Sequence, residues 1–355
     1  MINSRIAVIS DLHLTNSLPY TNPIGNERKR LLKKYLKFFF HKLHRLNIKV
    51  LVVPGDICHS ASLDSEDLEL LDFFLGLINF YSIDTIMIDG NHDIDGRRSI
   101  LGFLEGSSTY KLVNYFSERS FKWSYRDIDF HCINYCSQHE FISSAAMRVL
   151  HKDKDKFNIL VGHVGVKGSM HGTMKSIVGL KKTDIEELGK EFDLIILGHH
   201  HQFQWVTPKC LYVGAPQQTR IDEINTTPGG IIINVPSLKV GVIENKLSPR
   251  FSVVEGAGFS HPDIYGKIVK PVFKEDTPEA DRVDIIKRIM VYKPYHLIKP
   301  RMKERFKVAK DSGSFPKDKR QSLIRTMKSF SEEKKRPRSF YEHTLEIYEK
   351  VGEDV

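Results

Sequence analysis

The amino-acid sequence predicts an α/β fold in which a parallel sheet is followed by a second sheet and then by a small separate module. Short apolar strands alternate with amphipathic helices over residues 5–93, and a β-α-β-α-β order implies parallel strands joined by right-handed crossovers. Further short strands separated by Pro and Gly follow over residues 202–254. The length of 355 residues allows about two domains.

The first part of the chain shows strand and helix patterns in strict alternation. Strands are expected at residues 5–10, 49–54 and 84–89, and helices at residues 27–46 and 64–80. The helices show apolar residues at helical spacing, and Asp64 is placed to cap the second one. The third strand ends at Gly90, where a glycine allows a sharp turn and a close approach of the backbone to its surroundings.

The later elements are less regular. We expect two or three antiparallel strands within residues 110–134, a helix near residues 139–150, and strands at residues 157–161, 192–197, 267–273 and 295–298. Thr183 and Glu186 form a capping box for a short helix that Gly189 closes. Thr277, with Pro278 at the first helical position, opens a helix to about residue 290.

Composition and charge narrow the class of protein. The chain has no apolar run of 18 residues and no basic-then-apolar leader, so neither a membrane span nor a signal peptide is expected. Its four cysteines form no C-x-x-C pair, which predicts reduced thiols in a cytoplasmic protein. Residues 299–338 hold fifteen Lys/Arg against five Asp/Glu, a balance of +10 within a net charge of +9. The rest of the chain is therefore nearly neutral, and this segment is typical of an arm for a polyanion or an acidic partner.

Polar side chains follow the expected strands at the points where those strands end. They are carboxylate, amide or imidazole groups: Asp11, His13, Asp56, Asn91, His163, His199 and His201. Ligands of open α/β sheets bind outside the carboxyl ends of the strands. Such a set of side chains suits two divalent cations about 3.5–4 Å apart, a pair that supports hydrolysis of phosphoesters. The mix of imidazole and carboxylate favours Mn, Fe or Zn, and the lack of thiolates argues against a structural zinc site.

These residues carry a resemblance to a known family. Asp11-x-His13, Gly55-Asp56, Gly90-Asn91-His92-Asp93, Gly162-His163 and Gly198-His199-x-His201 resemble, in order, the five motifs of the calcineurin-like metallophosphoesterases. The resemblance implies a metallophosphoesterase β-sandwich with flanking helices (α/β/β/α). It also implies that one metal takes Asp11, His13, Asp56 and His201, and that the other takes Asp56, Asn91, His163 and His199.

Two further segments resemble the SbcD-type nucleases within that superfamily. They are Asp56-Ile-Cys-His59 and the stretch from Tyr212-Val-Gly-Ala-Pro216 to Arg220-Ile-Asp-Glu223. This resemblance, closest in plan to phage recombination nucleases, implies a nuclease domain over residues 1–258 and a DNA-binding capping module over residues 259–300. Residues 301–355 would then be a basic linker and partner-binding helices. The implied function is a manganese-dependent DNA exonuclease/endonuclease that processes double-strand breaks with an SbcC-type ABC ATPase in a bacterial or phage-infected cytoplasm.

The resemblance also implies roles for residues that do not bind metal. His92 would orient or protonate near the scissile phosphate, Asp93 would orient His92, and His59 would position the DNA strand. The alternative for His59 is a structural hydrogen bond at a helix entry. His200 is expected to point away from the metals, and His171 either touches the DNA backbone or lies in a solvent loop.

Other interpretations remain open from the sequence. The helix over residues 64–80 is apolar over more of its circumference than one sheet face needs, which favours a homodimer. Two functional alternatives stand beside the nuclease: a stand-alone phosphodiesterase acting on small nucleotides, and an inactive DNA-tethering scaffold.

Overall fold

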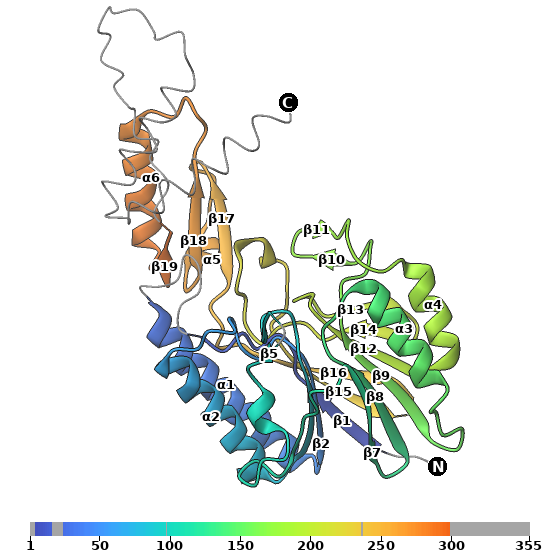
Figure 1. Ribbon diagram of the computed structural model, residues 1–355. Helices are drawn as coiled ribbons and strands as arrows, with labels where there is room; N and C mark the ends of the chain where they lie inside the picture. The colour runs from blue at the N-terminus through green and yellow to red at the C-terminus, as the bar shows by residue number, and fades with distance from the viewer. Residues whose placement is uncertain (1–3, 16–23, 97, 236, 299–355) are drawn as a thin grey trace, which may run out of the picture. The chain divides into compact units, whose positions relative to one another are not determined.

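A computed structural model describes residues 4–15, 24–96, 98–235 and 237–298. Its centre is a pair of six-stranded sheets (Figure 1). The first sheet has the order β16-β15-β1-β2-β3-β6. Its strands are β1 (Ser4–Val8), β2 (Val50–Pro54), β3 (Asp84–Ile88), β6 (Val113–Asn114), β15 (Gly229–Val235) and β16 (Lys239–Glu244). Strands β1, β2, β3 and β6 are parallel, as the β-α-β-α-β pattern predicts.

The second sheet has the order β13-β14-β12-β9-β8-β7. Its strands are β7 (Ser120–Tyr125), β8 (Ile128–Ile133), β9 (Phe157–His163), β12 (Leu194–Gly198), β13 (Gln204–Thr207) and β14 (Cys210–Tyr212). The central strands β8, β9, β12 and β14 are parallel, and β7 and β13 are antiparallel at the two edges.

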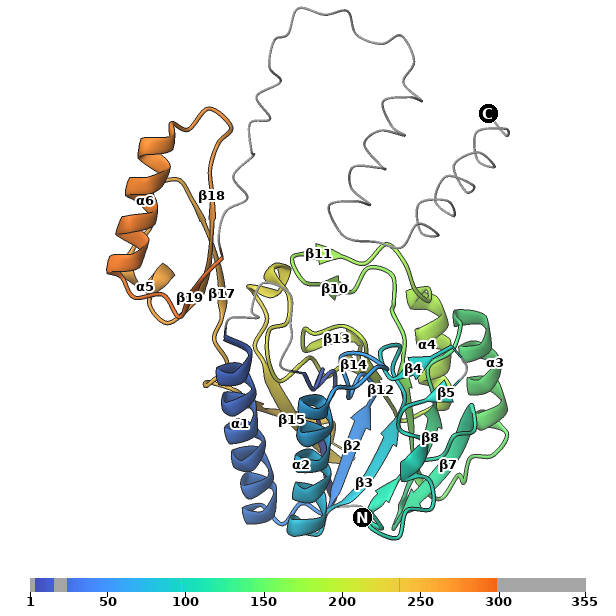
Figure 2. The same ribbon diagram turned by 60° about the vertical axis from the view of Figure 1, so that its left-hand side comes forward.

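The two sheets pack face to face, and a pair of helices covers the outer face of each (Figures 1 and 2). Alternate residues of β2 show this directly: Val50 and Val52 belong to the core between the sheets, whereas Leu51 and Val53 belong to the core under the helices. Strands buried on both faces have continuous apolar sequences. The helices are α1 (Gly25–Arg45) and α2 (Ser65–Tyr81) on the first sheet, and α3 (Gln138–Val149) and α4 (Lys182–Glu191) on the second. The α/β/β/α sandwich is therefore confirmed.

Some local expectations were wrong. The capping box of α4 does not use Thr183 and Glu186, because the backbone N–H of Lys181 donates to Asp184 instead. Gly189 lies inside this helix and does not close it. The strands over residues 202–254 do not all join the second sheet, since β15 pairs antiparallel with β1 and extends the first sheet.

The module that follows is a small three-stranded parallel sheet with its own core. Its elements are β17 (Phe251–Glu255), α5 (His261–Ile264), β18 (Ile268–Val272), α6 (Glu279–Val291) and β19 (His296–Leu297). Pro278 is the N-cap of α6 and not its first helical residue, so the helix begins one residue later than expected. Strand β17 pairs with β18, so the module includes residues before position 259. The expected basic linker and partner-binding helices, residues 301–355, lie outside the described residues.

Short hairpins and 3₁₀ helices lie between the main strands and helices of the sandwich. They are the hairpins β4 (Ile94–Asp95) with β5 (Arg98–Ser99) and β10 (Met170–His171) with β11 (Met174–Lys175), and the 3₁₀ helices η2 (Gly102–Leu104) and η3 (Ile221–Glu223). All four cysteines are unpaired. Among the described helices, none combines the length and apolar character needed to cross a bilayer.

Candidate metal centre

Seven polar side chains meet where strands of both sheets end. Two strands of the first sheet, β1 and β2, are followed by the segments that carry Asp11, His13 and Asp56, and β3 is followed by Asn91. The second sheet supplies His163 at the end of β9 and the histidines after β12. In the parallel register of β9 and β12, Gly198 pairs with His163, so these two strands end side by side. All of the side chains predicted to bind metal therefore lie at one end of the sandwich.

One group of these side chains centres on the Nε2 atoms of two histidines. Nε2 of His13 lies 3.0 Å from Nε2 of His201, and Nε2 of His201 lies 3.7 Å from Oδ1 of Asp11. Ligand atoms of these three residues all fall within 4.8 Å of one another. Two ring nitrogens and one carboxylate oxygen thus face a common point.

The second group shares a carboxylate with the first. Oδ2 of Asp56 lies 3.4 Å from Nε2 of His163 and 3.7 Å from Nε2 of His13, so this oxygen stands between the two groups. The side-chain oxygen of Asn91 lies 3.2 Å from Nε2 of His163 and 3.1 Å from Nδ1 of His199. The carboxylate of Asp56 thus lies between an imidazole of the first group and an imidazole of the second, and the amide of Asn91 belongs to the second group.

The outer nitrogens of three rings are already engaged on the side away from this centre. Nδ1 of His163 donates to the carbonyl of Pro54 at 2.8 Å, and Nδ1 of His201 lies 2.7 Å from Oε1 of Glu223. Nδ1 of His13 lies 3.3 Å from Nδ1 of His59. Metal-binding histidines are oriented in this way, with one nitrogen on a partner and the other turned to the cation. The residues present therefore fit two divalent cations.

Strained backbone concentrates at the same residues. Positive φ occurs at nine described non-glycine residues, and four of them are Asp11, His13, Asp56 and His199. Such conformations cost about 1–3 kcal/mol each and gather at functional sites. At Gly90, a Cβ would lie 2.1 Å from Oδ1 of Asp56, which explains why a glycine stands directly before Asn91.

Burial and neighbouring charges raise the pKa values of some side chains of the site and lower those of others. Burial lowers the pKa of His163, but the carboxylate of Asp56 and the hydrogen bond to it outweigh burial and raise this pKa to about 9. Burial also lowers the pKa of His201, but Glu223 raises it to about 9. The pKa of His199 falls to about 3 because of burial and the neighbouring charge of His163. For Asp56, burial raises the pKa, yet the charges of His163 and His13 bring it below its usual range. A bound cation would replace one proton on His163 and one on His201.

The side chains expected near the scissile phosphate lie beside this centre. The rings of His59 and His92 are stacked, with centroids 5.5 Å apart and planes 18° apart, and His92 lies 4.8 Å from the ring of His13. Nδ1 of His92 donates to the carbonyl of His59 at 2.7 Å. The three rings of His13, His59 and His92 also form a group that could hold a cation.

Asp93 does not orient the ring of His92, and that expectation is corrected. Its carboxylate is fully buried and accepts from the backbone N–H groups of Ile57, Cys58 and Gly90 at 3.2, 2.8 and 2.9 Å. Asp93 therefore holds together the loops after β2 and β3. The sequence does not distinguish a residue that orients His92 from one that holds the two loops together, because Asp93 follows His92 directly in either case.

His200 and His171 lie on the far side of His199. Nδ1 of His200 is 2.9 Å from the hydroxyl of Ser169, and its ring stacks on Tyr212 at 4.6 Å, so His200 points away from the centre as expected. His171 stands in the β10–β11 hairpin with Nε2 3.2 Å from a nitrogen of Arg220. Its ring is 6.5 Å from that of His199.

One residue of the site had no role assigned from the sequence. Glu223 is part of the quoted Arg220–Glu223 segment, but its proximity to His201 comes from the loop after β14, and no spacing in the sequence signals it.

Most of the chain that forms the sandwich matches a known family. Residues 4–203 match the model of the family described as calcineurin-like phosphoesterase. No curated protein matches the chain. Among solved structures, a dimetal phosphatase from Danio rerio is similar at 11% identity and a TM-score of 0.43, covering 68% of this chain and 99% of its own. The protein TT1561 of Thermus thermophilus is similar at 11% identity and a TM-score of 0.42, covering 69% of this chain and 100% of its own. The family match spans more than half of the chain, and the chain belongs to the calcineurin-like phosphoesterases, a family of phosphoester hydrolases.

Proposed function

We propose that this phosphoesterase is a manganese-dependent DNA exonuclease/endonuclease that acts with an SbcC-type ABC ATPase in double-strand-break processing and recombination. The stacked pair of His59 and His92 carries the proposal. His59 is the histidine of the Asp56-x-x-His59 feature that SbcD-type sequences share, and it lies at the edge of the metal centre. A second imidazole beside the proposed proton donor suits a polymeric substrate whose strand must be positioned as well as cleaved.

The chain supplies a ligand set for each cation. Asp11, His13, Asp56 and His201 would hold one, and the second would be held by Asp56 together with Asn91, His163 and His199. When bound, two such cations lower the pKa of a shared water and neutralise charge on the phosphoryl oxygens.

The remaining steps belong to protein side chains. Because Nδ1 of His92 donates to the carbonyl of His59, Nε2 is the ring nitrogen left to hold a proton for the phosphate or the leaving oxygen. His59 would place the strand beside it, and His171 would contact the DNA backbone from the β10–β11 hairpin.

The partners in this proposal rest on charge and on exposed apolar residues. The basic segment over residues 299–338 would meet DNA or the ATPase. Helix α2 packs on the sheet and against α1, where the rings of Phe40 and Phe74 are 5.9 Å apart. The apolar side chains it leaves exposed include Leu68 at 51% and Phe80 at 77%. A homodimer through α2 would use these two residues.

A substrate comparison tests the proposal. Purified protein with Mn²⁺ is given linear duplex DNA, plasmid DNA and cyclic nucleotides, alone and with a co-expressed ABC ATPase. The nuclease assignment predicts cleavage of DNA and little hydrolysis of cyclic nucleotides. Hydrolysis of cyclic nucleotides alone would support the small-nucleotide phosphodiesterase, and DNA binding without any hydrolysis would support the scaffold.

A further inference from the structure

Glu223 has a buried carboxylate, and both of its oxygens have hydrogen-bond partners within the protein. Its side chain is 4% exposed, and Oε1 lies 2.7 Å from Nδ1 of His201. The backbone N–H of Thr219 donates to Oε2 at 2.7 Å, and the hydroxyl of Thr219 donates to Oε1 at 3.1 Å. A buried carboxylate with this set of donors has one orientation only.

This orientation decides which nitrogen of His201 carries a proton in the neutral ring. An ionised carboxylate can only accept hydrogen bonds, so Nδ1 of His201 must be the protonated nitrogen. Nε2 then presents its lone pair toward Asp11 and His13, from which it is 3.7 Å and 3.0 Å away. The opposite tautomer would place a hydrogen where a cation must bind.

We infer that Glu223 is a positioning residue for one of the two cations, acting through His201, an inference that rests on the metal centre proposed above. The second cation would not depend on it, because the Nδ1 atom of His163 is held by the carbonyl of Pro54 instead. The two cation positions are therefore supported by different groups, a carboxylate for one and a backbone carbonyl for the other.

The segment around Glu223 is fixed by further buried hydrogen bonds. The amide nitrogen of Gln218, which is fully buried, donates to the backbone carbonyl of Glu223 at 2.6 Å. The amide oxygen of Gln218 accepts from the backbone N–H of Phe251 at 2.7 Å. Gln218 thus connects the segment that orients His201 to the first strand of the small module.

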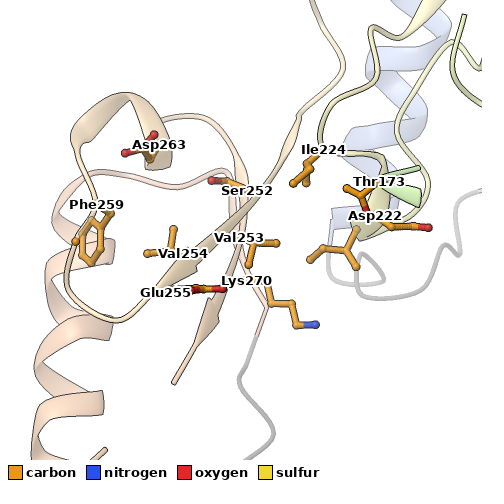
Figure 3. A pocket seen from close by; sticks show the side chains of 12 residues that line it. Thr173, Asp222, Ile224, Ser252, Val253, Val254, Glu255, Phe259, Asp263 and Lys270 are labelled. Atoms are coloured by element: carbon orange, nitrogen blue, oxygen red, sulfur yellow. The ribbon is translucent and has the colours of Figure 1, made fainter. Parts of the chain in front are cut away.

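The other residues of η3 face a different environment. Ile221 and Asp222 line a cavity of about 660 Å³ together with residues of β17 such as Val253 and Glu255 (Figure 3). Asp222 also pairs with Arg220 at 3.1 Å. Asp222 is consequently a matched control for Glu223, being an acidic neighbour in the same short helix that does not contact His201.

Calorimetric titration of Mn²⁺ into metal-free protein tests this role. The variants are Glu223→Ala, Glu223→Gln and the control Asp222→Asn. Wild type should bind two Mn²⁺ per chain. Both Glu223 variants should weaken one of the two binding events by about 10–100-fold, the usual effect of removing the partner of a ligand histidine. The other event and the Asp222→Asn variant should keep wild-type affinities.

The glutamine variant separates positioning from packing. Its amide oxygen is needed by the backbone N–H of Thr219, so its NH₂ group faces His201 and favours the tautomer protonated on Nε2. Positioning therefore predicts that Glu223→Gln loses the one affinity as Glu223→Ala does, although glutamine fills the same space. Wild-type binding by Glu223→Gln, or equal weakening of both events in either variant, would overturn the inference.

The same titration keeps this inference apart from the proposed function. Two bound Mn²⁺ in wild type with no activity on DNA would leave the role of Glu223 intact while contradicting the nuclease. Fewer than two bound Mn²⁺ in wild type would contradict the metal centre itself, and the role of Glu223 with it.

Discussion

Nδ1 of His163 lies 2.8 Å from the carbonyl oxygen of Pro54, and this hydrogen bond joins the two sheets at the metal centre. Pro54 ends β2 in the first sheet, and His163 ends β9 in the second. The contact turns Nε2 of His163 toward Asp56. The geometry of the site therefore depends on how closely the two sheets approach at this end.

Gly198 allows that approach, and Gly198→Ala is expected to disrupt it. A Cβ at this position would lie 2.1 Å from the carbonyl oxygen of Pro54 and 2.7 Å from Nδ1 of His163. Overpacking of this kind costs about 1–3 kcal/mol, and Mn²⁺ affinity should fall with it. Denaturant unfolding and calorimetry measure the two effects. As a control, Gly76→Ala in α2 meets nothing within 4 Å and should stabilise the protein by about 0.5–1 kcal/mol. Equal stabilities for both variants would contradict this account.

His92→Ala is expected to abolish most phosphodiester hydrolysis without removing the cations. General acid–base groups contribute about 10²–10⁴-fold to rate, and His92 is outside both predicted ligand sets. The rate on duplex DNA and the Mn²⁺ content per chain are measured together. The exposed His139 in α3 provides a control, since His139→Ala should retain the full rate. Loss of bound Mn²⁺ in His92→Ala would show that His92 is a ligand instead.

Asp93→Asn is expected to destabilise the fold more than it changes the chemistry. Burial and the charge of Asp56 raise the pKa of Asp93 to about 8, yet its carboxylate accepts three backbone N–H groups. An asparagine has one acceptor oxygen and would turn its NH₂ toward these donors. Each buried group left unsatisfied costs about 1–3 kcal/mol, which chemical unfolding would detect. An unfolding free energy equal to that of wild type would argue against this structural role.

Mn²⁺ affinity is expected to rise between pH 7 and pH 9. The pKa values of His163 and His201 in the metal-free protein are about 9, so each imidazole holds a proton below that pH and must release it to bind a cation. Affinity should therefore increase by up to about tenfold per pH unit for each proton released. Titrations in buffers of different ionisation enthalpy count those protons. A constant affinity with no proton release would contradict the assignment of these two ligands.

The sandwich was largely predictable because its strands and caps use local signals. Asp64 caps α2 by accepting from the backbone N–H groups of Glu66 and Asp67, as its place before the apolar pattern predicts. Parallel βα units bring Asp11, Asp56 and Asn91 to one edge by topology alone. The strand ends therefore indicate the place of the site without reference to any tertiary contact.

What the sequence could not reveal depends on contacts between distant segments. The apolar sequence of β15 would suit either sheet, and only its pairing with β1 places it in the first sheet. The carboxylates of Asp93 and Glu223 differ from metal ligands only in their hydrogen-bond partners. Asp93 accepts from three backbone N–H groups, and Glu223 contacts His201 and Thr219. Neither set of partners has a fixed spacing along the chain.

The central claim is that the carboxylate of Asp56 bridges two cations, and anomalous diffraction from crystals grown with Mn²⁺ tests it most directly. The account predicts two anomalous peaks about 3.5–4 Å apart, both at coordination distance from Asp56, one beside His13 and His201 and the other beside His163 and His199. A single peak, or peaks that leave Asp56 uncoordinated, would contradict it.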